Sequence, residues 1–331
     1  MNRSGFYVLV LTLLAACMPN PPLPSSTPVT SSTPSATFTV TPNPTQMFTS
    51  TAAPTSMPES FVPNFDHIVI LVFENKEYGT VIGNPDMPIF NQYAENYTLL
   101  TQFYAVTHPS LPNYIAMIGG DTFGVDRNCN NCFVSAPSLP DLVEASGRTW
   151  KTYQEDMPEP CYLGDKVDYV QKHNPFVYFD SIRLDSLRCE RSVVPLTTLQ
   201  TDIELDMLPN FIFITPNLCN SAHDCSLAVA DEWLGNTLTL LGPALDRDSS
   251  NYLIDLTWDE GQGDHSCCGL PEKAGGRIAV VLVSPLVKNL FQDPSQYTHY
   301  SLLKTISKAW GLPYLGHSAE ENHRLIIAPF Q

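Results

Sequence analysis

Two apolar segments of this chain end in pairs of oxygen-bearing side chains. The run His67–Phe73 is followed directly by Glu74-Asn75, and the run Tyr252–Trp258 is followed by Asp259-Glu260. In an open α/β sheet, ligands bind outside the carboxyl ends of the strands. If these runs are neighbouring strands, their ends bring together four hard oxygen donors, the ligand type that Ca²⁺, Mg²⁺ and Mn²⁺ prefer. The sequence therefore predicts a site for one divalent cation.

A candidate nucleophile lies between these two runs, in the segment Thr107–Asn113. Ser110 precedes Leu111-Pro112, a spacing that places the proline in the first turn of a helix, where its missing N–H does no harm. Serine is a common helix cap, which is one interpretation of this residue. A hydroxyl at a helix N-terminus beside a cation is also suited to attack phosphorus, because free backbone N–H groups favour phosphate there. The segment alone leaves both interpretations open.

Strands and helices that alternate along the chain are needed to position such groups. We expect strands near residues 67–73, 149–153, 211–215, 252–258 and 277–283, and helices near 87–97, 110–118, 139–145, 227–241 and 301–310. This alternation predicts a largely parallel central sheet covered on both faces, that is, a three-layer α/β/α sandwich. Residues 155–191 are rich in Pro, Tyr and charge, and we expect them to form loops over the active face.

The N-terminus has the pattern of an export signal. A start that contains Arg3 precedes the apolar run Phe6–Leu14 and a few small residues. Leu14–Cys17 resembles a bacterial lipobox, which predicts cleavage and lipidation of Cys17; an ordinary signal peptide with an incidental cysteine is the alternative. The run is shorter than the ~20 residues of a transmembrane helix. We therefore expect an extracytoplasmic protein that is held at the cell membrane only by a lipid anchor.

Composition divides the chain into three parts. Residues 1–17 contain the signal peptide and the lipobox. Residues 18–63 are dominated by Pro, Ser and Thr with almost no charge, which is typical of a disordered tether. Residues 64–331 are enough for one large α/β domain and contain no internal repeat or linker-like break. They are predicted to form a single catalytic domain.

The chain is strongly acidic. Its formal net charge is −17, from 17 Lys and Arg residues against 34 Asp and Glu residues. Nucleic acids are bound mainly through basic patches, so a polynucleotide partner is disfavoured. Anionic lipid headgroups are poor electrostatic partners for the same reason. A small phosphorylated substrate remains compatible with this charge, because the field of a bound cation dominates near the site.

Eight cysteines remain after Cys17, an even number that indicates disulfides in an exported chain. Cys129 with Cys132, and Cys219 with Cys225, are plausible local pairs, and Cys161 with Cys189 would close a long irregular stretch. Cys267 and Cys268 are adjacent, which is an awkward arrangement for a bridge. A zinc site built on Cys129 and Cys132 is the rival interpretation, although no second pair has matching spacing.

Five motifs occur in a fixed order along the chain. They are Glu74-Asn75, Thr107–Tyr114, Thr215–Asn220 with His223-Asp224, Thr257–Gly261 and Tyr300–Thr305. Together they resemble the bacterial and fungal phosphoesterase family that holds acid phosphatases and phospholipase C enzymes, and that is similar in fold to alkaline phosphatase. The resemblance covers nearly all of residues 64–325. Within the family the chain looks nearer the compact secreted acid phosphatases, including those that act on phosphoinositides, than the haemolytic phospholipases with their long C-terminal extension.

The resemblance implies a role for each residue of the predicted centre. Glu74, Asn75, Asp259 and Glu260 would bind the cation, and Ser110 would be the nucleophile beside it. Neutral Asn75 fits among the carboxylates because it contributes an oxygen without adding charge repulsion.

Four further polar residues are assigned to the phosphate or its surroundings. His223 lies in a family motif that implies phosphate contact, and its imidazolium could donate to a nonbridging oxygen or to the leaving group. Asn220 belongs to the same motif. His265, which follows the predicted cation ligands Asp259 and Glu260, either lines the pocket or orients its loop. His108 either helps to bind phosphate or has a structural role in the turn before Ser110. A purely structural histidine is the alternative for His223.

These inferences predict a metal-dependent phosphoesterase that hydrolyses phosphomonoesters through a phosphoserine intermediate. The expected partner is a small phosphorylated substrate or a phospholipid headgroup. A phospholipase C-type phosphodiesterase would share every catalytic residue, and a non-catalytic surface lipoprotein that binds a ligand is an alternative of another class. The sulfatases of this fold need an Arg shortly after the Ser-x-Pro turn, and Asn113-Tyr114 stands there instead. The cation's identity, the natural substrate and the oligomeric state stay open.

Overall fold

A computed structural model of the chain describes residues 61–249 and 251–330. The strands are β1 His67–Phe73, β2 Thr98–Tyr104, β3 Trp150–Gln154, β4 Val193–Pro195, β5 Phe211–Thr215, β6 Tyr252–Trp258, β7 Arg277–Val283 and β8 Phe291–Thr298. The α-helices are α1 Tyr78–Val81, α2 Pro88–Asn96, α3 Ser110–Gly119, α4 Leu139–Ala145, α5 Asp180–Arg183, α6 Ser186–Ser192, α7 Thr198–Glu204, α8 Leu227–Asp248 and α9 His299–Trp310. Four 3₁₀ turns complete the set: η1 Gln171–His173, η2 Pro175–Tyr178, η3 Gly316–Ala319 and η4 Ala328–Phe330. The predicted signal peptide, Cys17 and nearly all of the predicted 18–63 tether lie outside the described residues.

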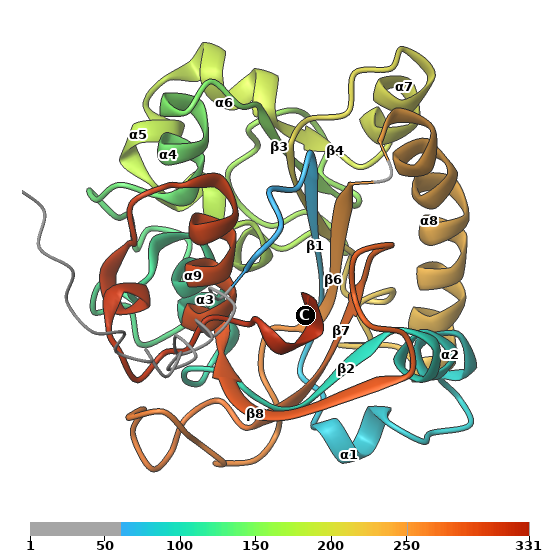
Figure 1. Cartoon of the computed structure of the whole chain (residues 1–331). Helices are drawn as coiled ribbons and strands as arrows, with labels where there is room; N and C mark the ends of the chain where they lie inside the picture. Colours follow the sequence, from blue (N-terminus) through green and yellow to red (C-terminus); the bar gives the residue numbers. More distant parts are fainter. Residues whose placement is uncertain (1–60, 250, 331) are drawn as a thin grey trace, which may run out of the picture. The chain divides into compact units, whose positions relative to one another are not determined.

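One eight-stranded sheet organises the described part of the chain, in the order β4-β3-β5-β1-β6-β7-β2-β8. Every neighbouring pair is parallel except the two pairs that involve β7, which runs antiparallel to both β6 and β2. Helices α2 and α8 cover one face of the sheet and helices α3 and α9 the other (Figure 1). The predicted α/β sandwich with a largely parallel sheet is confirmed.

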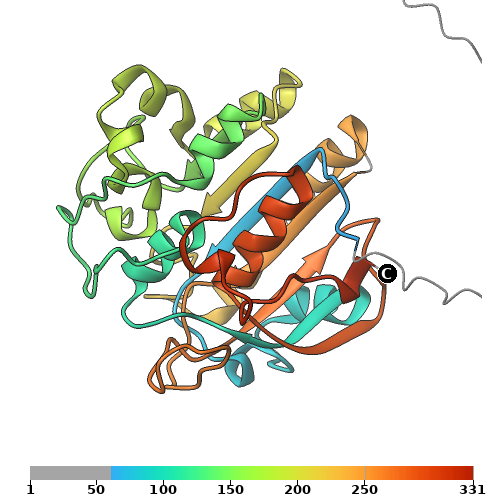
Figure 2. The same ribbon diagram turned by 60° about the vertical axis from the view of Figure 1, so that its left-hand side comes forward.

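The central strands form because most of their residues are apolar. All seven residues of β1 and all seven of β6 are buried, as expected for strands with helices on both faces. On one face Phe73 packs against Trp258 and against Trp233 of α8. On the other, α9 runs along the sheet in front of β1 (Figure 2), and its Trp310 packs edge-on against Phe211 of β5. The two buried faces hold β1 and β6 in a fixed register.

Several elements differ from the expectation. Strands β2, β4 and β8 were not expected, and β8 contains Pro294, which a strand tolerates because β8 is at the edge of the sheet. Helix α8 continues beyond residue 241, through Pro243 to Asp248. The stretch 155–191, expected as loops, contains the short helices α5 and α6 and the turns η1 and η2.

Four disulfides are present, and they include every pairing considered from the sequence. Cys129 is bonded to Cys132, Cys161 to Cys189, Cys219 to Cys225 and Cys267 to Cys268. The first bond rules out the zinc interpretation of Cys129 and Cys132 in this structure, because a disulfide leaves no thiolate to bind metal. Among the described helices, none has both the length and the apolar character needed to cross a bilayer.

Candidate active site

Three carboxylates converge where β1 and β6 end. The two strands are parallel neighbours with Phe73 opposite Trp258, so Glu74 and Asp259 leave the sheet side by side. Glu74, Asp259 and Glu260 are all buried, and each offers an oxygen within 4.8 Å of the others. The structure therefore brings together three of the four oxygen donors predicted from the two strand ends.

Ser110 lies directly against these carboxylates. It is the first residue of α3, a helix whose ten residues are all buried, so its position is fixed by the core. Its Oγ lies 2.6 Å from Glu74 Oε1 and 3.0 Å from Glu260 Oε1. A serine hydroxyl has one proton, which it can donate to only one of these oxygens at a time. Both carboxylates are thus placed to accept a proton from Ser110.

Asp259 is fixed by backbone groups around it. Its Oδ1 accepts hydrogen bonds from the backbone N–H of Asn75 at 2.8 Å and of Glu260 at 2.7 Å, and its own carbonyl lies 2.7 Å from His299 Nε2. Asn75 adopts a positive φ of 55°, which asparagine tolerates better than most residues. The structure thus gives Asn75 a backbone role in holding Asp259, while its predicted role as the fourth cation ligand stays a prediction.

The donor set fits a divalent cation. Asp259 Oδ2 is buried and has no hydrogen-bond partner among the described residues, which is costly unless a ligand compensates it. Burial, together with the charges of Glu74 and Glu260, raises the pKa of Asp259 well above its usual range. Three buried carboxylates repel one another strongly, and a hard divalent cation is the ligand that relieves this repulsion. Glu74, Asp259 and Glu260 would hold it.

Two basic residues that the sequence did not single out contact the same centre. Lys172 Nζ lies 2.8 Å from Glu74 Oε1 and 3.4 Å from Ser110 Oγ, and His173 pairs with the other oxygen of Glu74. Burial alone would raise the pKa of Glu74, but these two partners outweigh it and hold the pKa below its ordinary value. The only sequence signal for them was a Lys-His pair in the stretch expected to cover the active face.

His223 approaches the centre from the segment after β5. Its Nδ1 lies 2.6 Å from Asp224 Oδ1, and its Nε2 lies 3.9 Å from Glu74 Oε1. The carboxylate of Asp224 therefore orients the imidazole so that the opposite ring nitrogen faces the carboxylates. This geometry places His223 within reach of a substrate bound beside Ser110.

His108 also belongs to the centre. Its Nδ1 is hydrogen-bonded to Glu260, which raises the pKa of the imidazole against the opposing effect of burial, and its Nε2 lies 3.0 Å from the carbonyl oxygen of Gly263. His108 thus links the nucleophile turn to the loop that follows Glu260. His108 is thus placed to orient Glu260, a predicted cation ligand. Its contact with phosphate stays a prediction from the sequence.

The remaining two predicted residues have their polar groups directed elsewhere. The amide of Asn220 donates to both oxygens of Glu155, at 2.9 and 3.0 Å, and Glu155 also accepts from Trp233. The side chain of His265 is 74% exposed and lies 3.5 Å from Glu77. Neither side chain is brought to Ser110 in this structure, and their assignment to the phosphate stays a prediction.

The N-terminus of α3 offers fewer free amides than expected. The N–H of Leu111 donates to Asn128 Oδ1 at 3.1 Å, and Pro112 has no N–H. In the described residues the first turn therefore presents the amide of Ser110 rather than a cradle of several donors. Among the side chains, Lys172 brings a positive charge to this turn, with its Nζ 3.4 Å from Ser110 Oγ.

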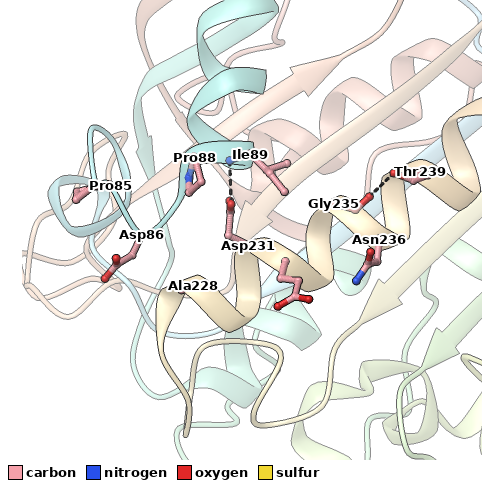
Figure 3. Close-up of a pocket in the computed structure, with 10 residues that line it drawn as sticks. Pro85, Asp86, Pro88, Ile89, Ala228, Asp231, Gly235, Asn236 and Thr239 are labelled. Carbon is pink, nitrogen blue, oxygen red and sulfur yellow. Dashed lines mark hydrogen bonds between the residues drawn. The ribbon is translucent and has the colours of Figure 1, made fainter.

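A cavity of about 490 Å³ opens beside the centre. Its walls include Asn128, Asn130, Asp165 and Lys172, whose ammonium reaches Ser110. Another cavity, of about 520 Å³, lies between α2 and α8 (Figure 3). There both carboxylate oxygens of Asp231 accept hydrogen bonds from backbone N–H groups of α2, so the role of Asp231 in this cavity is structural. The cavity at Lys172 adjoins the candidate nucleophile, because the Lys172 ammonium lies 3.4 Å from Ser110 Oγ.

Comparisons with known proteins place the chain in a family. Residues 83–313 match the phosphoesterase family. The chain is 34% identical over 278 residues to a phosphate-repressible acid phosphatase of Penicillium chrysogenum, with 79% of this chain and 64% of that protein covered. It is 36% identical over 265 residues to an acid phosphatase of Aspergillus fumigatus, with coverage of 76% and 56%. The chain thus spans less than two thirds of the length of these two fungal relatives.

A bacterial relative matches over a larger share of its own length. The chain is 32% identical over 270 residues to the phosphatidylinositol-3-phosphatase of Mycobacterium tuberculosis, with 78% of this chain and 81% of that protein covered. Among solved structures, a protein in the alkaline phosphatase superfamily from Vibrio parahaemolyticus superposes with a TM-score of 0.52 at 11% identity, covering 79% of this chain and 71% of that one. That likeness shows the shared fold. With most of its folded part matched in sequence, the chain belongs to the phosphoesterase family.

Proposed function

We propose that this protein is an acid-phosphatase-like hydrolase of phosphomonoesters that uses Ser110 as its nucleophile and requires a divalent cation. The observation that carries the proposal is the buried contact of Ser110 Oγ with Glu74 and Glu260, at 2.6 and 3.0 Å. A hydroxyl fixed between two proton acceptors, next to an ammonium group, is arranged for nucleophilic attack. The names of the fungal and mycobacterial relatives support the same reaction class.

Glu74, Asp259 and Glu260 would hold the cation, with Asn75 as the predicted fourth ligand. When bound, the cation supplies Lewis-acid polarisation of the phosphoryl group and compensates negative charge near Ser110. The identity of the cation is left to experiment, because Ca²⁺, Mg²⁺ and Mn²⁺ all accept this oxygen-rich donor set.

The first chemical step would form a phosphoserine. Ser110 Oγ attacks phosphorus and passes its proton to Glu260, because Lys172 and His173 hold the pKa of Glu74 below its ordinary value and make it the weaker base. The Oγ–P bond forms as the ester P–O bond breaks, and His223 donates a proton to the departing oxygen. Lys172 faces the negative charge that builds up on the phosphoryl oxygens, where a fixed positive group is most effective. In the second step water passes a proton to His223 as it attacks phosphorus, the Oγ–P bond breaks, and Ser110 takes back its proton from the carboxylate that accepted it.

Replacing the nucleophile tests this proposal. Ser110→Ala should reduce turnover of p-nitrophenyl phosphate by at least roughly 10³-fold, since the covalent route is lost, while isothermal titration should still show cation binding. The matched control is Ser301→Ala, another buried serine in the first turn of a helix, whose Oγ accepts from the Thr298 backbone. That control should lose stability and keep its activity. Appreciable turnover by the Ser110 variant would refute the nucleophile assignment.

The ester class is decided by a parallel assay. We expect wild-type protein to hydrolyse p-nitrophenyl phosphate far faster than phosphatidylcholine, a phosphodiester. The reverse preference would support the phospholipase C-type alternative, which uses the same residues. Ligand binding without turnover of either ester would support the non-catalytic alternative.

We further propose that the protein is extracytoplasmic and lipid-anchored through Cys17. Four disulfides within the described residues support an oxidising compartment. Metabolic labelling with a tritiated fatty acid in a bacterial host should mark the wild-type chain and leave a Cys17→Ser chain unlabelled. Equal labelling of both chains would contradict the anchor.

A further inference from the structure

Residues 161–170 form a small hairpin beside the mouth of the site, and its tip carries exposed apolar side chains. Lys166 and Tyr169 exchange two backbone hydrogen bonds, of 2.9 and 3.0 Å, which leaves Val167 and Asp168 as the two turn residues. The side chains of Leu163 and Val167 are 48% and 82% exposed. We call residues 163–168 the hairpin tip.

Val167 is an unfavourable choice of residue for folding. It has a positive φ of 52°, a conformation that β-branched side chains rarely adopt and that Gly or Asn adopts readily. Nothing in its surroundings offsets the strain, because the side chain is almost fully in water. Strained residues that gain no packing are concentrated at functional positions. A binding role for the Val167 side chain would account for its presence.

The hairpin is held rigidly, so its tip has a defined direction. A disulfide joins Cys161 at its base to Cys189. Asp165 accepts a hydrogen bond from the backbone N–H of Gln171, and the Gln171 side chain accepts one from the backbone N–H of Gly164. These contacts hold the tip in place before any partner binds, which lowers the entropic cost of binding.

The hairpin stands at the active site. The cavity beside the centre is lined by both Asp165 and Lys172, and Lys172 contacts Ser110. The carbonyl of Asp168 accepts a hydrogen bond from the backbone N–H of Leu218, in the segment that leads to His223. Whatever the tip contacts is therefore brought to the entrance of the same cavity.

The described chain enters the sheet at the end away from the site. Strand β1 runs from His67 to Phe73 and Glu74 follows at the site, so residues 61–66 lie toward the opposite end of the strands. A lipid anchor upstream of residue 61 would keep the protein near a bilayer without turning the cavity toward it. A rigid apolar tip at the entrance would supply that orientation.

We propose that the hairpin tip inserts into a phospholipid bilayer and presents the site to lipids whose headgroup is a phosphomonoester. Leu163 and Val167 would enter the apolar region, and the Lys166 side chain between them is long enough to return its ammonium to the headgroups. Two protruding side chains are too few for a stable protein interface, which needs about 800 Å² on each partner. They suffice for a weak bilayer contact that acts together with an anchor. This inference rests on the proposed function, because it states that the phosphomonoester substrate is a lipid within a bilayer.

Flotation with vesicles and two forms of one substrate test the proposal. The protein is the full chain with Cys17→Ser, so that the predicted anchor makes no contribution. The vesicles are phosphatidylcholine with a minor fraction of long-chain phosphatidic acid, and the soluble substrate is a short-chain phosphatidic acid below its micelle concentration. Val167→Asn should lower vesicle partition and hydrolysis of the vesicle lipid by roughly tenfold, since most of the buried apolar area is lost. Hydrolysis of the short-chain lipid should be unchanged.

Leu290 provides a matched control. It is 78% exposed with a φ of 55°, but it lies just before β8, at the end of the strands that is opposite the site. Asn at either position relieves backbone strain, so neither variant should have a lower Tm than the parent protein. Leu290→Asn should leave partition unchanged. Since the net charge is −17, added salt should not release the protein from the vesicles.

Two results would overturn the inference: unchanged partition of Val167→Asn, or an equal loss in Leu290→Asn. A protein partner for the tip would give the first of these results. Failure of the proposed function is separately visible, because the parent protein would then hydrolyse neither form of phosphatidic acid whether or not it floats with vesicles.

Discussion

Lys172 links the nucleophile to a carboxylate of the centre, since its ammonium contacts both Ser110 Oγ and Glu74 Oε1. We expect Lys172→Met to lower kcat/KM for p-nitrophenyl phosphate by roughly 10²-fold, the usual effect of removing one fixed positive donor from a transition state. Inhibition by inorganic phosphate should weaken in parallel. Lys172→Arg should restore part of both losses, because it keeps the charge.

A second buried Lys–carboxylate pair provides the control for this change. Lys151 Nζ lies 2.6 Å from Asp202 Oδ2, and Lys151 and Lys172 are both mostly buried. Lys151→Met should lower the Tm and leave kcat/KM unchanged. If both variants lose the same activity, Lys172 acts through stability alone and its assignment fails.

His223 is predicted to act on the leaving group, so its effect should depend on what leaves. An alkoxide needs a proton at departure, whereas p-nitrophenolate does not. His223→Gln should therefore reduce kcat for glycerol 2-phosphate by roughly 10²-fold and kcat for p-nitrophenyl phosphate by less than about tenfold. Asp224→Asn should show the same pattern more weakly, because it disturbs only the orientation of the imidazole. Equal losses on both esters would indicate a phosphate-binding role instead.

Strand β6 carries a carboxylate that the proposed chemistry does not use. Asp255 is fully buried and neither of its oxygens has a hydrogen-bond partner among the described residues. Burial raises its pKa well above the ordinary value, so the folded protein favours the protonated form. The resulting contribution to stability is complete below the unfolded pKa of about 3.9 and is lost as the pH rises toward the folded pKa.

Asp255→Asn removes this dependence on pH. The free energy of unfolding of the variant, relative to wild type, should increase between pH 5 and pH 8 by up to about 1.4 kcal/mol per pH unit. Urea unfolding at the two pH values measures it. Asp293→Asn is the comparison, since the carboxylate of Asp293 accepts the Tyr297 hydroxyl and its loss should destabilise at both pH values. A pH-independent difference for Asp255→Asn would contradict the prediction.

The strands of the sheet show which elements and site residues could be predicted from the sequence. Strands β1 and β6 are mostly apolar, so both their strand character and the positions of Glu74 and Asp259 follow from simple patterns. Strand β8 was not predicted, because only three of its eight residues are buried and it contains Pro294. Lys172 and His173 were not predicted as site residues for another reason. They lie on a 3₁₀ turn with no periodicity, and only tertiary packing brings that turn to β1. Patterns predict elements and their ends, whereas a loop's place over a site depends on the whole fold.

On the scale of the whole molecule, the cation should stabilise the fold as well as support activity. A ligand that binds only the native state adds about 2.7 kcal/mol at a concentration a hundred times its Kd. Treatment with EDTA should therefore lower both activity and Tm, and add-back of Ca²⁺, Mg²⁺ or Mn²⁺ in turn should restore both and identify the preferred ion. Differential scanning fluorimetry with a parallel activity assay measures this.

A matched pair of variants checks that the effect arises at the proposed site. Asp259→Asn should abolish the rise in Tm on add-back, since it removes a carboxylate from the three that converge. Asp264→Asn removes an exposed acidic group five residues away and should keep the full rise. A cation effect that survives in Asp259→Asn would locate the ion elsewhere.

The reversed direction of β7 has a consequence for how substrate range can change. Because β7 is antiparallel to β6, the segment from Gly261 to Gly276 both leaves and rejoins the sheet at the end of the strands where the candidate active site lies. Glu77 secures the two ends of that segment by accepting backbone hydrogen bonds from Gln262, Gly263 and Arg277. The segment is thus a loop tied down at both ends, so a change of length in its interior does not require a shift in the register of β6 or β7. Variation in this loop is a way to alter the surroundings of Ser110 while the strands that carry the carboxylates stay in place.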